Sequence, residues 1–90
     1  HADLAAGAGR ALVISLAAHA PDDRAGMTNP AGGQRREIAA LEATGTKVLL
    51  RGPVSVDYDA LMDPAQVAAA RADGAAQAAE DAEAIAAAWA

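Results

Sequence analysis

The scarcity of large apolar side chains constrains the fold of this chain more than any other feature. Hydrophobic residues make up 53% of the 90 residues, but 29 of these 48 are alanine and only 19 are of a larger type. Buried apolar surface stabilises a fold by roughly 25 cal/mol per Å², and an alanine methyl group buries little area. We therefore expect a small α/β unit that needs neighbouring structure to offset its conformational entropy.

Two short apolar runs flank a helical pattern. Residues 11–17 (ALVISLA) predict a strand buried on both faces, although the pattern alone also permits a short buried helix. Residues 34–44 predict an amphipathic helix that ends at Gly45, and residues 46–51 (TKVLLR) predict a second buried strand. This order predicts a βαβ unit with parallel strands and a right-handed crossover. Between the first strand and the helix, residues 18–33 form a long loop rich in turn-forming residues.

The sequence Asp63-Pro64-Ala65-Gln66 predicts the start of a long C-terminal helix over residues 64–89. It offers an N-cap carboxylate, a proline at the first helical position and a glutamine spaced for a capping box. A solvated, partly frayed C-terminus is the alternative. One stripe of the helix carries mostly small residues that would let another backbone approach closely, namely Val67, Ala70, Gly74, Ala78, Ala82, Ile85 and Trp89.

Charge and composition exclude several classes of function. The net charge of −5 and the absence of any Lys or Arg run argue against a nucleic-acid partner. The chain has no cysteine, no apolar stretch long enough to span a membrane and no signal-peptide pattern. We expect a soluble protein, with the cytoplasm favoured over secretion. The start at His1 instead of Met suggests a processed, truncated or internal segment.

Ser15, His19 and Asp22 are the residue types of a catalytic triad. On one extended strand, however, Ser15 and His19 would lie about 13 Å apart, whereas a base must lie within ~3 Å of its nucleophile. We interpret Ser15 as part of a buried strand and His19 as exposed at its end. His1 has no partner pattern either.

Other candidate motifs have simpler interpretations. Asp57, Asp59 and Asp63 alternate like calcium ligands but lack the glycine and glutamate of an EF-hand, and the adjacent Asp22 and Asp23 are typical of a solvated turn. Gly7-Ala8-Gly9 precedes a strand instead of following one, and Gly45-Thr46-Lys47 marks the end of a helix. Gly32-Gly33 before Gln34-Arg35-Arg36 could bind an anion, although a glycine N-cap with solvated arginines is favoured. We therefore expect no catalytic, cofactor-binding or metal-binding residue in this chain.

Three segments follow one another along the chain, namely ADLAAGAGRALVIS, REIAALEATGTKVLL and LMDPAQVAAARADGAAQA. Together they resemble the bacterial patatin-like phospholipases. The first segment resembles the turn and strand that follow the family's catalytic Asp-Gly motif, with His1 where the family usually has Asn. The second segment resembles the next helix and strand of the family. The third resembles the family's C-terminal tail, which begins with Asp-Pro-Ala. The resemblance implies the C-terminal part, residues 1–90, of one three-layer α/β/α domain. It also implies a Ser-Asp dyad that hydrolyses lipid or other carboxylic esters.

The catalytic motifs of that family lie outside this chain. No Gly-x-Ser-x-Gly is present, neither Ser15 nor Ser55 lies between glycines, and Asp73-Gly74 falls inside the predicted helix. By the resemblance, Asp3 would have a structural role beside the active site, and the partner of this segment would be the remainder of the parent chain with its lipid or ester substrate. The competing hypotheses are a non-enzymatic α/β interaction module and a small independent hydrolase using Ser15 and His19.

Overall fold

The computed structural model describes residues 2–21 and 30–90. A parallel strand pair connected by a helix is its central feature. Strand β1 (Arg10–Ile14) pairs with β2 (Lys47–Arg51) in continuous register from Arg10↔Lys47 to Ile14↔Arg51, and helix α1 (Gly33–Ala43) lies between them in sequence. The predicted strand-helix-strand unit with parallel strands is therefore confirmed. Helix α2 (Val67–Trp89) follows, and the 3-10 turns Ala2–Ala5, Tyr58–Ala60 and Pro64–Gln66 complete the order.

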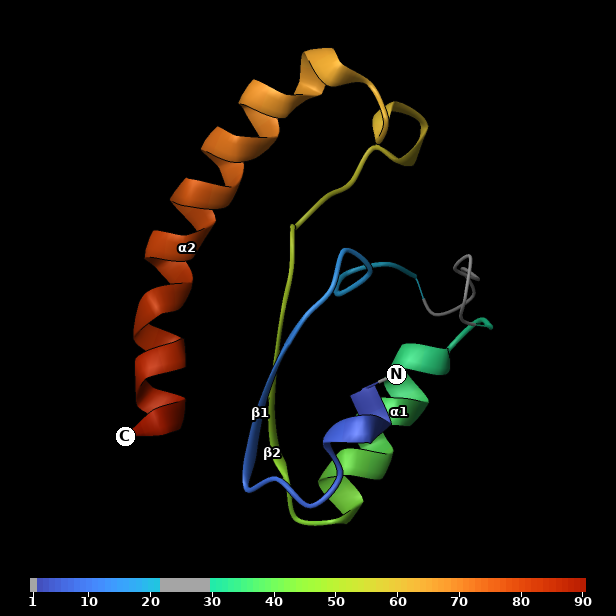
Figure 1. The fold of residues 1–90 in the computed structure, drawn as a ribbon, viewed down its shortest axis with the longest axis vertical. Helices are drawn as coiled ribbons and strands as arrows, with labels where there is room; N and C mark the ends of the chain where they lie inside the picture. Colours follow the sequence, from blue (N-terminus) through green and yellow to red (C-terminus); the bar gives the residue numbers. More distant parts are fainter. Residues whose placement is uncertain (1, 22–29) are drawn as a thin grey trace.

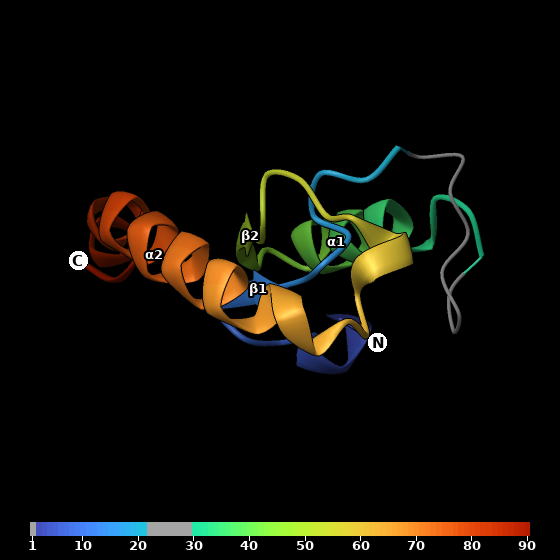
Figure 2. The same cartoon turned by 90° about the horizontal axis from the view of Figure 1, so that it is seen from above.

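The two helices lie on opposite sides of the strand pair. In Figure 1 the strands stand between α2 and α1, and Figure 2 shows the same arrangement from above. Helix α2 runs back along the strands, so its C-terminal end comes close to the point where β1 begins. There, Arg10 Nη2 donates a hydrogen bond to the carbonyl oxygen of Ala90 (3.4 Å). The layer order is thus helix, sheet, helix.

The first strand is shorter than predicted. The sequence predicts a strand to residue 17, but β1 ends at Ile14 because a tight turn begins at Ser15. Ser15 Oγ accepts a hydrogen bond from the Ala17 amide (3.1 Å), and the Ser15 carbonyl accepts one from the Ala18 amide (3.2 Å). Serine side chains that bond to nearby backbone compete with strand pairing in this way. Burial on both faces is also not reached, since Ala11 is buried but Ile14 is 78% exposed.

Helix α1 ends where the sequence predicts. Gly45 adopts a left-handed conformation (φ 89°), and its amide donates to the Glu42 carbonyl (3.0 Å). The left-handed conformation is accessible to glycine because it has no Cβ. The next residue, Thr46, is buried, and its hydroxyl donates to the Ala8 carbonyl (2.7 Å). This bond fixes the chain entering β1 against the chain entering β2.

The start of α2 follows the predicted signal with two differences. Asp63 Oδ1 accepts a hydrogen bond from the Ala65 amide (2.9 Å), but Pro64–Gln66 is a 3-10 turn and α2 proper begins at Val67. The capping box is not formed, because the Asp63 amide already donates to the Ala60 carbonyl (3.0 Å).

The predicted stripe of small residues is not the face that α2 turns toward the sheet. Of that stripe only Ile85 is half-buried; the residues of α2 that reach this level of burial are Gln77, Asp81, Ala84, Ile85 and Ala88. On the face toward the sheet, polar contacts stand beside the apolar Ala84, Ile85 and Ala88. Gln77 Nε2 donates to the carbonyl oxygen of Gly52, and Asp81 Oδ1 lies 3.1 Å from Arg51 Nε.

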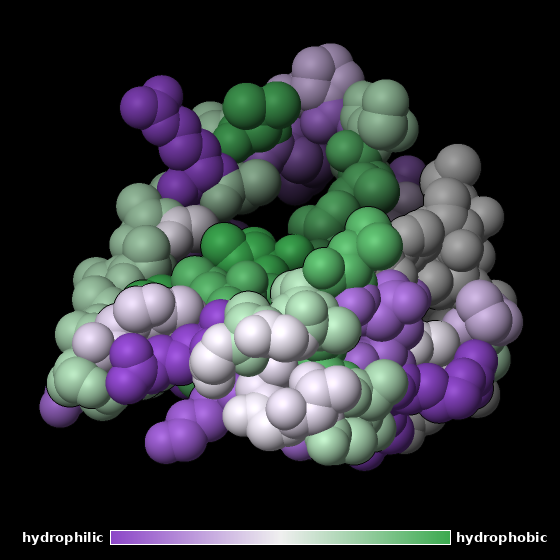
Figure 3. All heavy atoms as spheres, turned by 60° about the horizontal axis from the view of Figure 1, so that its bottom comes forward, coloured by the Kyte–Doolittle hydropathy of each residue, from purple (hydrophilic) through white to green (hydrophobic). Residues whose placement is uncertain are grey.

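The chain buries little of its apolar surface. Ala11 and Leu41 are the buried hydrophobic residues among those described, and of these Leu41 is fully buried. The accessible surface is 6480 Å², against about 4800 Å² for a compact monomer of this mass. The radius of gyration is 14.4 Å, against about 12 Å for a compact 90-residue domain. Large apolar side chains are instead exposed, and Figure 3 shows apolar surface lining an open hollow in the middle of the molecule.

Candidate functional site

A cleft of about 510 Å³ lies between α1, β2 and the turn that follows β1. It is lined by Ser15, Ala17, Ala18, Ala20, Pro21, Pro30, Gly32, Gly33, Gln34, Arg35, Ile38, Ala39, Glu42 and Leu50. The cleft therefore opens at the carboxyl end of the strands, which is where open α/β sheets usually bind ligands. No motif in the sequence marks this cleft, although the carboxyl ends of the predicted parallel strands indicate its place.

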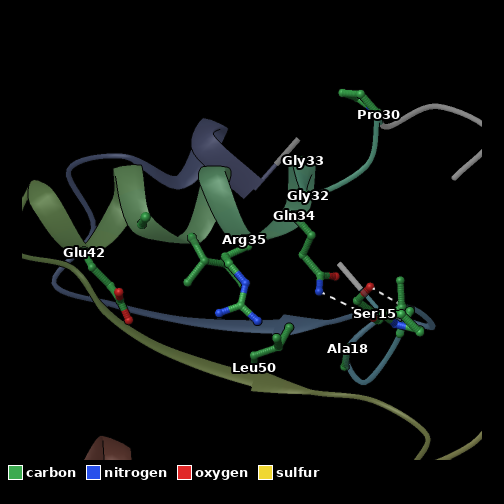
Figure 4. A pocket seen from close by; sticks show the side chains of 14 residues that line it. Ser15, Ala18, Pro30, Gly32, Gly33, Gln34, Arg35, Glu42 and Leu50 are labelled. Carbon is green, nitrogen blue, oxygen red and sulfur yellow. Dashed lines mark hydrogen bonds between the residues drawn. The ribbon is translucent and has the colours of Figure 1, made fainter. Parts of the chain in front are cut away.

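Contacts from two other elements hold the turn at one end of this cleft. The Gln34 side chain at the start of α1 donates a hydrogen bond to the Ala17 carbonyl (3.2 Å). Figure 4 shows the Gln34 side chain extending toward this turn. The Tyr58 hydroxyl donates to the Leu16 carbonyl (3.3 Å). Gly52 packs directly beneath, where an added Cβ would overlap the Ser15 carbonyl and approach the Ala18 Cβ to 2.8 Å. The turn after β1 is thus a structural junction of three segments.

Of the three residues considered as a triad, the structure describes Ser15 and His19. Because β1 ends at Ile14, Ser15 and His19 share a turn, and the distance expected for an extended strand does not apply. Ser15 Oγ instead accepts a hydrogen bond from the Ala17 amide, and the His19 side chain is exposed. Asp22 and its neighbours Asp23 and Arg24 lie outside the described residues, as does His1. Within the described residues, Ser15 and His19 share no hydrogen bond.

At the helix start Gly32-Gly33, some of the groups that could bind an anion already form hydrogen bonds within the protein. Gly32 is left-handed (φ 70°), the Gly33 amide donates to the Pro30 carbonyl (2.9 Å), and the Arg36 guanidinium turns back to the Ala31 carbonyl (3.0 Å). Arg35 and Glu42 both line the cleft (Figure 4), so groups of both charge signs face it. This arrangement does not select for an anion.

The alternating aspartates act as turn caps. Asp57 Oδ1 accepts hydrogen bonds from the Asp59 and Ala60 amides (3.1 and 3.3 Å), and Asp63 caps the turn before α2. No group of three or more potential metal ligands occurs among residues 2–21 and 30–90.

Gly7 and Gly45 lie in turns, as predicted. Gly7 is left-handed (φ 91°) in the turn before β1, and Gly45-Thr46-Lys47 passes directly from α1 into β2. Asp3 is exposed in the first 3-10 turn, next to Ala2, whose amide donates to Glu37 Oε2 (3.2 Å). That bond links the N-terminal turn to α1.

Comparison with known protein families, with curated proteins and with solved structures gave no match to this chain. In the part of the chain that the structure describes, no helix combines the length and the apolar character needed to cross a bilayer. The described residues thus supply a sheet edge, two covering helices and a cleft, without a paired nucleophile and base.

Proposed function

We propose that this segment is the C-terminal structural portion of a patatin-like serine lipid acyl hydrolase. The catalytic serine and aspartate would be supplied by the remainder of the parent chain. The segment itself would contribute two parallel strands and their covering helices to the three-layer domain. It would have no catalytic residue of its own.

The observation that carries the proposal is the incomplete burial of a parallel sheet. Parallel sheets occur almost entirely with both faces covered, and their strands read as continuous apolar runs. Here the described part of the sheet has two strands, and Ile14 at the end of β1 is 78% exposed. A strand pair needs further strands or packed helices to be stable, and the exposed end of β1 indicates that the two helices here leave the sheet incompletely covered.

The places of the three resembling segments in the structure support the same proposal. The first covers the N-terminal turn and β1, the second covers most of α1 and β2, and the third covers the turn before α2 and the first half of that helix. The segments therefore fall on successive parts of the helix-sheet-helix arrangement, in the order that the family resemblance implies.

The experiment compares the full-length protein containing this segment with residues 1–90 alone. We expect the full-length protein to hydrolyse p-nitrophenyl esters and to be labelled by a fluorophosphonate, which reacts with activated serines. Residues 1–90 alone should do neither. Hydrolysis by the isolated segment, or a full-length protein that neither hydrolyses esters nor is labelled, would sink the proposal.

Two serine variants separate this proposal from an independent hydrolase built on Ser15. Ser15→Ala should leave ester hydrolysis by the full-length protein within about twofold, because the Ser15 hydroxyl bonds to the Ala17 amide and not to a base. Ser55→Ala, at an exposed position, is the matched control. Loss of activity in Ser15→Ala alone would favour the independent hydrolase.

The alternative is a stand-alone interaction module that pairs through α2. Every residue of α2 before Gln77 is exposed, including Val67 at 65%, which leaves its first turns free to contact another protein. A stable, inactive protein consisting only of residues 1–90 would support this alternative.

A further inference from the structure

The hydrogen-bond pattern of the strand pair defines which backbone groups point outward. The Lys47 amide donates to the Gly9 carbonyl (3.0 Å), and the Ser15 amide donates to the Arg51 carbonyl (2.9 Å). Successive residues of a parallel strand direct their backbone groups to alternate sides. The N–H and C=O groups of Leu12 and Ile14 therefore face the outer edge of β1, and those of Val48 and Leu50 face the outer edge of β2.

Side chains occupy the carboxyl half of the outer edge of β2. The Leu50 carbonyl accepts a hydrogen bond from Arg51 Nη1 (2.8 Å), and the Gly52 carbonyl accepts one from Gln77 Nε2 on α2. Asp81 holds this arrangement together, because its carboxylate lies 3.1 Å from Arg51 Nε and 3.3 Å from Gln77 Nε2. The Arg51 Nε–H is not directed at the Asp81 oxygen, so this pair acts through charge more than through a hydrogen bond. A strand added here would have to displace both capping groups.

In the part of the chain that the structure describes, the outer edge of β1 has no such cover. Among the described residues, no backbone or side-chain group bonds to the outward amides or carbonyls of Leu12 and Ile14. Proteins usually protect an exposed edge with proline, inward charges or a bulge. None of these occurs after Arg10 in β1, whose sequence is RALVI. Unpaired backbone groups on an apolar strand are the feature to which extended segments add.

We propose that the outer edge of β1 receives a parallel, apolar strand from the remainder of the hydrolase chain, so that β1 is an interior strand and β2 an edge strand. This assignment rests on the proposed function. The added strand would be parallel because it extends a parallel sheet, and apolar because helices cover both sides of that sheet. A second copy related by a twofold axis would instead pair antiparallel across β1.

Residue-resolved hydrogen exchange of the full-length protein tests this assignment. We expect the Leu12 and Ile14 amides to exchange on the order of 100-fold more slowly than the Val48 and Leu50 amides, because paired core amides exchange only through opening of the structure. The Ala11 and Val13 amides, which face β2, serve as internal references. Slow exchange at Val48 and Leu50 with fast exchange at Leu12 and Ile14 would overturn the assignment.

Two further measurements on the same sample separate the possible failures. Fluorophosphonate labelling together with the reversed exchange pattern would leave the hydrolase proposal standing and remove the edge assignment. Protection of Leu12 and Ile14 without labelling would retain the added strand but remove the hydrolase. If that protection disappears on dilution as a dimer dissociates, the occupant is a second copy and the proposed intramolecular strand is wrong.

Discussion

Gly52 lies at a contact that leaves no room for a side chain. It lies directly after β2 and is buried against the turn that follows β1. A methyl group at this position would overlap the Ser15 carbonyl, which is backbone and cannot rotate away. The contact between the ends of the two strands thus depends on the absence of a side chain.

Gly52→Ala should destabilise the full-length protein by ~1–3 kcal/mol, because overpacking forces the backbone to shift. Gly74→Ala is the matched control, since an added Cβ there meets no atom within 4 Å. Alanine is the better helix former, so this control should stabilise the protein by about 0.5–1 kcal/mol. Urea unfolding measures the free energy of unfolding of both variants. Equal effects of the two substitutions would show that the contact with Ser15 is not formed.

At the scale of single elements, α2 depends on its polar start more than on apolar packing. None of its residues is buried, and its N-terminal half is exposed. The 3-10 turn Pro64–Gln66 precedes α2 and is capped by Asp63, whose carboxylate accepts a hydrogen bond from the Ala65 amide.

Asp63→Ala should therefore cost about 1 kcal/mol of unfolding free energy, the usual effect of losing an N-cap side chain. Asp73→Ala removes the same charge from an exposed position inside α2 and should be neutral or slightly stabilising. Thermal unfolding followed by circular dichroism compares the two. A larger loss in Asp73→Ala would contradict the capping role.

If β1 is an interior strand and β2 an edge strand, as we propose, the two strands should differ in their tolerance to proline. Leu12→Pro removes an amide that faces the proposed added strand, whereas Val48→Pro removes one from the edge of β2, and both side chains are half-buried. Proline is tolerated on edge strands and disruptive in central ones. The yield of folded, full-length protein should therefore fall severely for Leu12→Pro and much less for Val48→Pro. The reverse order would identify β2 as the interior strand.

Local signals in the sequence predicted most elements, because these elements are determined by neighbouring residues. Gly45 ends α1 and Asp63 precedes the last helix, as their chemistry requires. The end of β1 was missed because apolar periodicity does not reveal that the Ser15 hydroxyl bonds to the Ala17 amide. The cleft and the docking face of α2 depend on long-range contacts such as that between Gln77 and Gly52, which no local pattern contains.

At the scale of the whole molecule, exposed apolar surface determines the expected behaviour. Leu4 and Met62 are 89% and 91% exposed, and the sheet has an open apolar edge. Residues 1–90 expressed alone should therefore unfold without a sharp thermal transition and aggregate, as unprotected strand edges do. Differential scanning calorimetry and light scattering measure this. A cooperative transition in a monodisperse sample would contradict the need for further strands.

The intact mass and N-terminal sequence of the protein isolated from its native source test whether these residues belong to a larger hydrolase domain, as we propose. We expect a mass well above the 8.9 kDa of this chain, or a tightly bound second chain, with Gly-x-Ser-x-Gly and Asp-Gly motifs in the additional sequence. A folded species of 8.9 kDa or a simple multiple, with no other chain present, would contradict the claim and support an interaction module.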